Sequence, residues 1–410
     1  MKRVLHYLIL AAVLLGTPFA CCLLGGYDSI LEGVKQFPPR TEDWGFHPEL
    51  LWNVRRPFNW WWFLGMSGFT FACLFPLVRR GISALQAPGT THQAPGTTHQ
   101  APGTKHQAPG FPWFGWAGLG IIAVAWTLAW TRFAWFRPYQ PHTYFPLWLG
   151  LILLLNAVAF RRSGRSPLTD HPFIYALTFP VSSLFWWFFE YLNRYVWNWY
   201  YLGVSDMSAA EYLAYGTLCF STVLPGVLAM AAALGTFRFF DDRHYEGMAR
   251  VDVRSPMSRC VLFVLAAAGL TGIVFAPDFA YPLLWISPLM VFVLVQVLLG
   301  EPCILDRLKA GSWGLVFRFE IAALCCGLCW ETWNYWSYAK WVYAVPWVHG
   351  WQLWEMPLIG FAGYLPFGVE CAAVTAWLYD MFEAEPTKRP ACQDKGACGS
   401  WSGCTPTNSD

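Results

Sequence analysis

Charge is scarce in this chain of 410 residues, because Lys, Arg, Asp and Glu together make up only 13% of it. Positive and negative charges nearly cancel, leaving a net charge of +2. Nucleic-acid binding needs clustered Lys and Arg against the phosphates, so this balance argues against it. A soluble domain is equally unexpected, since hydrophobic residues reach 56% and aromatic residues 19% of the chain.

The chain also lacks the short motifs of the common enzyme classes. It contains no Walker loop, nucleophile elbow, HExxH motif or strand-linked GxGxxG. Most of its 13 Cys lie inside apolar runs, where a free thiol packs as a small apolar side chain. These residues therefore predict neither a disulfide framework nor a metal site, and the sequence leaves any cofactor and any enzymatic activity undefined.

Apolar runs of roughly 20 residues, the length that crosses a bilayer core as a helix, recur along the sequence. They predict an all-α fold, a polytopic transmembrane helical bundle of about ten spans. The run after Lys2 and Arg3 could also be a signal peptide, and we treat it as a retained helix. The predicted spans cover residues 4–24, 59–78, 112–135, 143–160, 173–192, 212–236, 257–276, 281–299, 313–333 and 355–379.

Positive residues fall mainly on one side of the predicted membrane. If each predicted span crosses the membrane, successive loops lie on opposite sides, and most Lys and Arg fall in loops on the same side. The positive-inside rule makes that side cytoplasmic. Both termini are then cytoplasmic, in an inner membrane. The residues on this side include Lys2, Arg79, Arg80, Arg161, Arg162, Arg165, Arg238, Arg243, Arg250, Arg254, Arg259, Arg307, Lys309, Lys388 and Arg389.

Two segments have no apolar face to bury. Residues 86–110 repeat QAPGTTH with a period of seven, which predicts a flexible linker, and Pro and Gly in each unit disfavour a metal site at its His residues. Residues 383–410 predict a disordered cytoplasmic tail. The remaining organisation is an N-terminal pair of spans in 1–85 and two four-helix units in 111–250 and 251–382.

These two units form an internal repeat. Glu190 and Asn193 recur 141 positions later as Glu331 and Asn334, each pair followed by an aromatic belt. The same offset relates a Phe, a Leu and a Pro of the next span in each unit. Because an even number of spans separates the units, the predicted repeats are parallel and related by an axis along the membrane normal.

Proline interrupts one span in each predicted unit, at Pro225 and at Pro366. A proline within a helix frees a backbone carbonyl and bends the helix. The sequence therefore predicts a kink at each position, which either opens a cavity or sets the packing.

The repeated acid and amide are the first candidate site. Glu190 and Asn193 share a helix face near the outer end of their span, and Glu331 and Asn334 do the same. With Trp199 and Trp341, they predict an outer-leaflet pocket for a lipid-like or small polar ligand. The alternative is structural: the polar groups accept indole and phenol hydrogen bonds and tie the outer loop to the next helix.

A second candidate site lies in the inner half of the predicted membrane. Glu320 and Glu370 belong to consecutive spans at similar depth, and an ionisable residue there is costly unless it has a function or a partner. As a pair they could act as catalytic acid and base or share a proton. The alternative is that Glu320 pairs with Arg318 and Glu370 with a polar neighbour.

The run FPVSSLFWWFFEYLNRYVWNWYY, with the preceding WFRPYQPHTYFPLWLG stretch, resembles uncharacterised bacterial multi-pass membrane proteins. That resemblance implies a bacterial inner membrane. More loosely, helical repeats with Pro and Glu in the spans resemble membrane carotenoid (lycopene) cyclases. In place of adjacent paired Glu after Pro, however, this chain has the single Glu370 in LPFGVE and Glu355 before Pro in WEMP.

The favoured function is a multi-pass inner-membrane protein that binds a lipid-like or small polar ligand in an outer aromatic and carboxylate pocket. The alternatives are a membrane-embedded enzyme acting on an isoprenoid or lipid, and a structural subunit of a membrane complex. The expected partners are membrane lipids and no nucleic acid.

Overall fold

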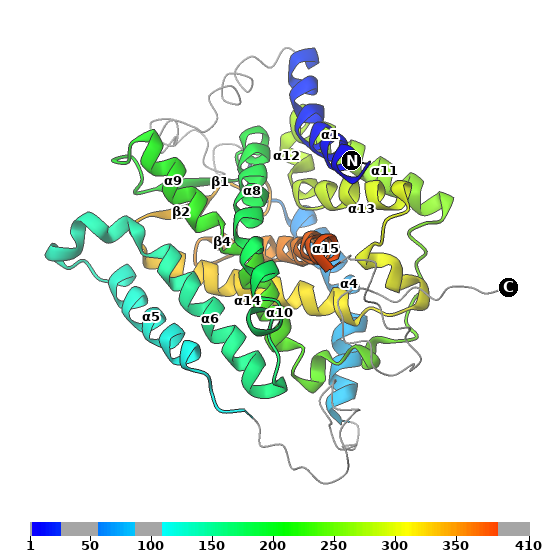
Figure 1. Cartoon of the computed structure of the whole chain (residues 1–410). Helices are drawn as coiled ribbons and strands as arrows, with labels where there is room; N and C mark the ends of the chain where they lie inside the picture. Colours follow the sequence, from blue (N-terminus) through cyan, green and yellow to red (C-terminus); the bar gives the residue numbers. More distant parts are fainter. Residues whose placement is uncertain (1, 26–55, 87–108, 384–410) are drawn as a thin grey trace, which may run out of the picture.

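The computed structural model describes residues 2–25, 56–86 and 109–383 (Figure 1). The predicted tail and nearly all of the QAPGTTH linker, with His92, His99 and His106, lie outside these residues, and so do Cys392, Cys398 and Cys404.

Helices make up most of the described structure and strands very little of it, which confirms the all-α prediction. The long helices are α1 (Lys2–Gly25), α4 (Trp60–Gln86), α5 (Trp113–Trp130), α6 (Tyr144–Ser163), α8 (Pro172–Val196), α9 (Ala209–Phe220), α10 (Val223–Leu234), α11 (Pro256–Phe275), α13 (Ser287–Leu299), α14 (Gly314–Trp336) and α15 (Tyr364–Glu383). The short helices are α7 (Pro167–Asp170), α12 (Pro277–Ala280), η3 (Ala134–His142), η4 (Arg238–Phe240), η5 (Asp242–Tyr245), η6 (Tyr281–Trp285), η7 (Ile304–Ala310) and η8 (Leu358–Gly363). Four short strands complete the fold: β1 (Trp199–Leu202), β2 (Lys340–Tyr343), β3 (Gln352–Leu353) and β4 (Met356–Pro357).

Membrane-length helices dominate the described part of the chain. Eight are long and apolar enough to cross a bilayer, or nine if the segment from Pro277 to Leu299, bent by 51°, is one span. The sequence predicted ten spans, and the predicted span 313–333, which is helix α14, is not among these eight or nine. This helix has 23 residues, roughly 34 Å of rise, but it carries Arg318, Glu320 and Glu331 and so falls outside the apolar class.

Helix α14 lies in the middle of the bundle with α10 and α15 (Figure 1). Helices α5 and α6 pack together on one flank, and α1 packs on α11 and α13 on another. The core between them is rich in aromatic rings, with the Trp148 and Trp330 ring centroids 4.8 Å apart. Burial by neighbouring helices thus explains how α14 tolerates polar residues that a lipid-facing helix would expose.

The packing is reciprocal between the two predicted units. Helix α10 packs on α8 of its own unit and on α14 of the other, while α15 packs on α14 and on α8. Strands β1 and β2 join the units as an antiparallel pair, in which Trp199 lies opposite Tyr343 and Tyr201 opposite Trp341. This short ladder is centred on Tyr200 and Val342.

A side chain from α8 enters the break between α9 and α10. The Leu224 N–H donates to Ser182 Oγ at 3.0 Å, and that hydroxyl donates to the Phe220 carbonyl at 2.6 Å. The hydroxyl therefore replaces one helical bond, the 224-to-220 bond, just before Pro225. This is the interruption that the sequence predicted there, and Ser182 satisfies the backbone groups it frees.

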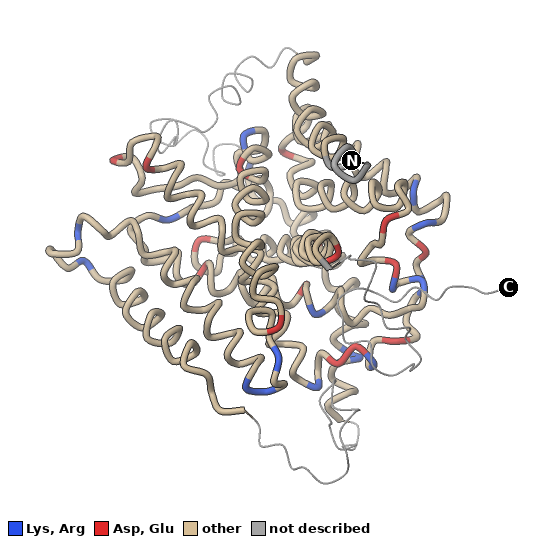
Figure 2. The backbone as a smooth tube through the Cα atoms, in the orientation of Figure 1, with Lys and Arg blue, Asp and Glu red and all other residues tan. Residues whose placement is uncertain are grey.

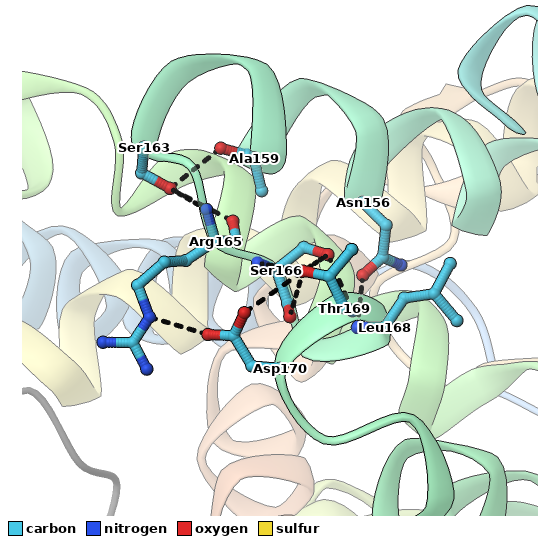
Figure 3. Close-up of polar contacts among 8 residues, drawn as sticks. All are labelled: Asn156, Ala159, Ser163, Arg165, Ser166, Leu168, Thr169 and Asp170. Atoms are coloured by element: carbon cyan, nitrogen blue, oxygen red, sulfur yellow. Dashed lines mark hydrogen bonds and ion pairs between the residues drawn. The ribbon is translucent and has the colours of Figure 1, made fainter. Parts of the chain in front are cut away.

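A buried amide organises the turn between α6 and α8 (Figure 3). Asn156 accepts from the Leu168 N–H at 3.0 Å and donates to the Tyr175 hydroxyl at 2.9 Å. Tyr175 in turn donates to the Pro225 carbonyl at 2.9 Å. The Arg165–Asp170 ion pair, 2.7 Å long, closes the outside of the turn. This chain of bonds fixes α6, α8 and α10 to one another.

Charged residues gather in loops and at helix ends, with long uncharged stretches between them (Figure 2). One cluster ties the α10–α11 loop to the α13–α14 loop, with Arg254 bonded to Asp306 at 2.7 Å and Lys309 to Asp252 at 3.0 Å. The Lys309 ammonium and then the Arg254 N–H lower the pKa of Asp252 below its ordinary 3.8. The two loops are therefore held together by ionised groups.

Replacing Ser182 with Ala leaves the Phe220 carbonyl and the Leu224 N–H without partners in a buried setting. We expect the free energy of unfolding to fall by about 1–3 kcal/mol, measured by denaturant titration in detergent. The matched control is Ser83→Ala, which removes a bond to Arg79 on the exposed side of α4. Equal losses in the two variants would contradict the bridging role of Ser182.

Acidification should weaken the clamp between the two charged loops. A depressed folded-state pKa means that the ionised Asp252 stabilises the fold above its unfolded pKa near 3.8 and that this contribution disappears as the pH falls through the folded-state pKa. The melting temperature of wild type should therefore exceed that of Lys309→Gln at pH 7, and the gap should close below pH ~3.8. Arg250→Gln, which removes an exposed charge from the same loop, should show no such closing gap. A gap for Lys309→Gln that is already absent at pH 7 would rule out the clamp.

Candidate functional site

Glu190 lies fully buried near the end of α8, with 0% of its surface exposed. One carboxylate oxygen, Oε1, accepts from Trp186 at 3.0 Å, from Trp199 at 3.1 Å and from the Tyr201 hydroxyl at 2.6 Å. Trp186 is one helical turn before Glu190, and the other two donors come from β1. The sequence predicted this acid near the outer end of its span, among the aromatic residues that follow it, and the structure encloses it in aromatic side chains.

Glu331 occupies the equivalent place on α14 and is also 0% exposed. Its Oε1 accepts from Trp341 at 3.3 Å and from the hydroxyls of Tyr343 at 2.7 Å and Tyr364 at 3.1 Å. Two of these donors belong to β2 and the third to α15. Each acid is thus bound by the Trp and the Tyr of its own strand and by one further ring.

The paired amides fix the strands to the ends of their helices. Asn193 donates to the Trp199 carbonyl at 2.9 Å and accepts from the Asn198 N–H at 2.8 Å. Asn334 donates to the Trp341 carbonyl and accepts from the Trp341 N–H, both at 2.8 Å. The amide therefore sets the position of the strand whose Trp and Tyr reach the acid one turn away.

A cavity of about 130 Å³ lies between the two units. All six rings that donate to Glu190 and Glu331 line it, and aromatic residues make up 12 of its 23 wall residues. The two carboxylates are not themselves in the wall, so they stand behind the rings. The aromatic wall residues are Tyr144, Trp186, Trp199, Tyr201, Tyr212, Tyr215, Phe220, Trp285, Trp330, Trp341, Tyr343 and Tyr364.

Two polar atoms behind the cavity wall lack a hydrogen-bond partner among the described residues. They are Oε2 of Glu190 and Oε2 of Glu331. Buried polar groups are normally satisfied, and an unsatisfied one points to a bound water, ion or ligand. These two oxygens therefore keep acceptor capacity that the side chains around them do not use.

The strand tyrosines stay protonated donors at neutral pH. Burial, and then the charge of Glu190, raises the pKa of Tyr201 well above its ordinary value of 10. Burial and then Glu331 do the same for the pKa of Tyr343. Both phenols therefore donate to their carboxylates across the physiological pH range.

The structure brings together the residues that the sequence proposed for ligand binding, since the β1–β2 pairing places both acids, both amides, Trp199 and Trp341 at one site. Sequence reasoning missed Trp186, Tyr201, Tyr343 and Tyr364 as partners of the acids. The spacing of four between Trp186 and Glu190 was a usable signal. No such signal pointed to Tyr364, because the residue 141 positions earlier is Val223 and the repeat therefore does not mark a tyrosine there.

The second candidate pair is not brought together by any bond among the described residues. Glu320 on α14 is partly exposed and Glu370 on α15 is 3% exposed, and Oε2 of each lacks a partner. Within the described ranges no group of three metal-ligating side chains occurs. Arg318, the partner considered for Glu320, instead lies 3.5 Å from Asp242, because Asp242 belongs to the charged loop beside the helix end.

Comparisons with protein-family models, curated proteins and solved structures find no match to this chain.

Replacing Glu331 with Gln should destabilise the site although the shape is kept. The neutral amide oxygen is a weaker acceptor than a carboxylate oxygen, and the new NH₂ group takes the place of Oε2, where no acceptor meets its two N–H groups. We expect a loss of about 1–3 kcal/mol in the free energy of unfolding, measured in detergent. Glu246→Gln, on an exposed loop, is the control and should be neutral. Wild-type stability in Glu331→Gln would show that the carboxylate does not hold the rings.

Proposed function

We propose that this protein is a multi-pass membrane protein that binds a lipid-like or small polar ligand in the aromatic cavity between its two units. The observation that carries the proposal is the wall itself: six rings are fixed by two buried carboxylates, and they enclose about 130 Å³. A water needs only roughly 10–15 Å³. Hydrogen bonds made solely for packing would leave no such space between the rings.

Two parallel four-helix repeats support this reading of the cavity. The order of elements recurs, with α5, α6, α8 and α10 matched by α11, α13, α14 and α15. The β1–β2 register is self-complementary: the offset of 142 that carries Trp199 to Trp341 also carries Tyr201 to Tyr343, and these four residues form two opposed pairs. Strands related by a twofold axis along the membrane normal pair in this way, and we place the cavity on that axis.

The charge distribution favours an outer-leaflet position for the cavity. Arg250 and Arg254 come just before the start of α11, and Lys309 comes just before the start of α14. Strand β2 follows the opposite end of α14. By the positive-inside rule the side with these Arg and Lys residues is cytoplasmic. We propose that both termini are cytoplasmic and that β1 and β2 lie at the opposite surface of a bacterial inner membrane.

Filling the cavity tests the proposal. A side chain at Gly216 on α9 meets Trp187 only at 3.4 Å, an ordinary contact, and Gly216 is a wall residue. Gly216→Leu should therefore occupy the cavity without disrupting the helix. Native mass spectrometry of the protein released gently from membranes should show a bound small molecule in wild type and at least tenfold less in the variant.

The matched control is Gly120→Leu, on α5, where nothing lies within 4 Å of an added Cβ. It should retain wild-type occupancy. Equal occupancy in Gly216→Leu and wild type, or no adduct in either, would contradict ligand binding in this cavity.

A further inference from the structure

We infer that the ligand of this cavity carries a compact organic cation, of the quaternary ammonium class, which sits among the six carboxylate-bound rings. This inference rests on the proposed function and specifies its ligand chemistry. Such a group occurs both on a phosphocholine lipid and on free choline-like molecules, and the experiment below separates these two sources.

The ring arrangement is the first support. The face of an aromatic ring is the negative end of its quadrupole and attracts cations, most strongly for Trp and then Tyr. Six rings of these two types line the cavity, three Trp and three Tyr. Each donates its N–H or O–H to a carboxylate, which pushes electron density into the ring and strengthens attraction at its face.

The charge distribution is the second support. Two acids stand behind the wall, and Glu190 has Arg194 one turn away on α8. The cationic wall residue, Lys340, is bonded to Glu355 at 2.5 Å, so its charge is already matched. Among the ion pairs and hydrogen bonds of the described chain, Glu331 has ring donors and no cationic side chain. A bound cation would supply the missing positive charge.

The wall disfavours an anion. Six donors at the wall point to the acids rather than to the ligand. An anion would lie beside aromatic rings backed by two carboxylates, whose charge repels it.

The size is suitable as well. A dry cavity of about 150 Å³ accepts a ligand the size of benzene, so a cavity of about 130 Å³ accommodates a trimethylammonium group.

Calorimetric titration with two probes of the same shape tests the inference. Choline is the cation, and 3,3-dimethylbutan-1-ol is its neutral isostere, which presents a tert-butyl group in place of trimethylammonium. The full-length protein in dodecyl maltoside should bind choline at least tenfold more tightly than the alcohol. Equal affinities would overturn the inference and leave the proposed function intact, and binding of neither probe would overturn the inference too.

The double variant Tyr201→Phe with Tyr343→Phe keeps both rings and removes their hydrogen bonds to the acids. It should lose at least threefold in choline affinity with no change for the alcohol. Tyr139→Phe, at an exposed position of η3, should match wild type for both probes. A double variant that binds choline as wild type does would overturn the part assigned to the carboxylates.

A third titration identifies the source of the cation. Dihexanoyl phosphocholine binding more tightly than choline supports a lipid headgroup, and choline binding at least as tightly supports a free solute. Dihexanoyl phosphatidylglycerol, which lacks the cation, should bind at least tenfold more weakly than dihexanoyl phosphocholine. Tighter binding of the glycerol lipid would overturn the inference. The Gly216→Leu occupancy measurement stands apart from these titrations, so failure of the ligand class is distinguishable from failure of the site.

Discussion

The structure depends on how two carboxylates are kept away from water. A buried Glu is costly unless donors replace its hydration, and here Glu190 and Glu331 each receive three indole or phenol donors on one oxygen. Meeting that requirement fixes six large rings in place. Because the donors come from β1, β2, α8 and α15, the same bonds also position the strands and α15 relative to the two long helices.

Much of this site follows from ordinary sequence signals. Apolar runs of membrane length predicted the helices, because a bilayer core requires them, and the constant offset between Glu190 and Glu331 identified the two acids as equivalent. Pro225 marked the interruption between α9 and α10. In each case the signal is local or repeated, so one sequence was enough to detect it.

The remainder depends on packing between distant segments. Strands β1 and β2 have four residues each, and nothing in such short stretches selects a partner. The absence of a hydrogen bond between Glu320 and Glu370 was equally hidden, because predicted depth along a helix does not say which neighbour each side chain meets. Composition also says little about α14, because it carries charged residues that burial by other helices makes tolerable.

The two halves of the site differ by one residue, since Asn193 reaches the carbonyl six positions on and Asn334 the carbonyl seven positions on. Their third donors also differ, Trp186 from the same helix in one half and Tyr364 from the following helix in the other. A ligand bound in the proposed cavity would therefore meet two unlike ends. The proposed site would accordingly take one ligand per chain, in one orientation.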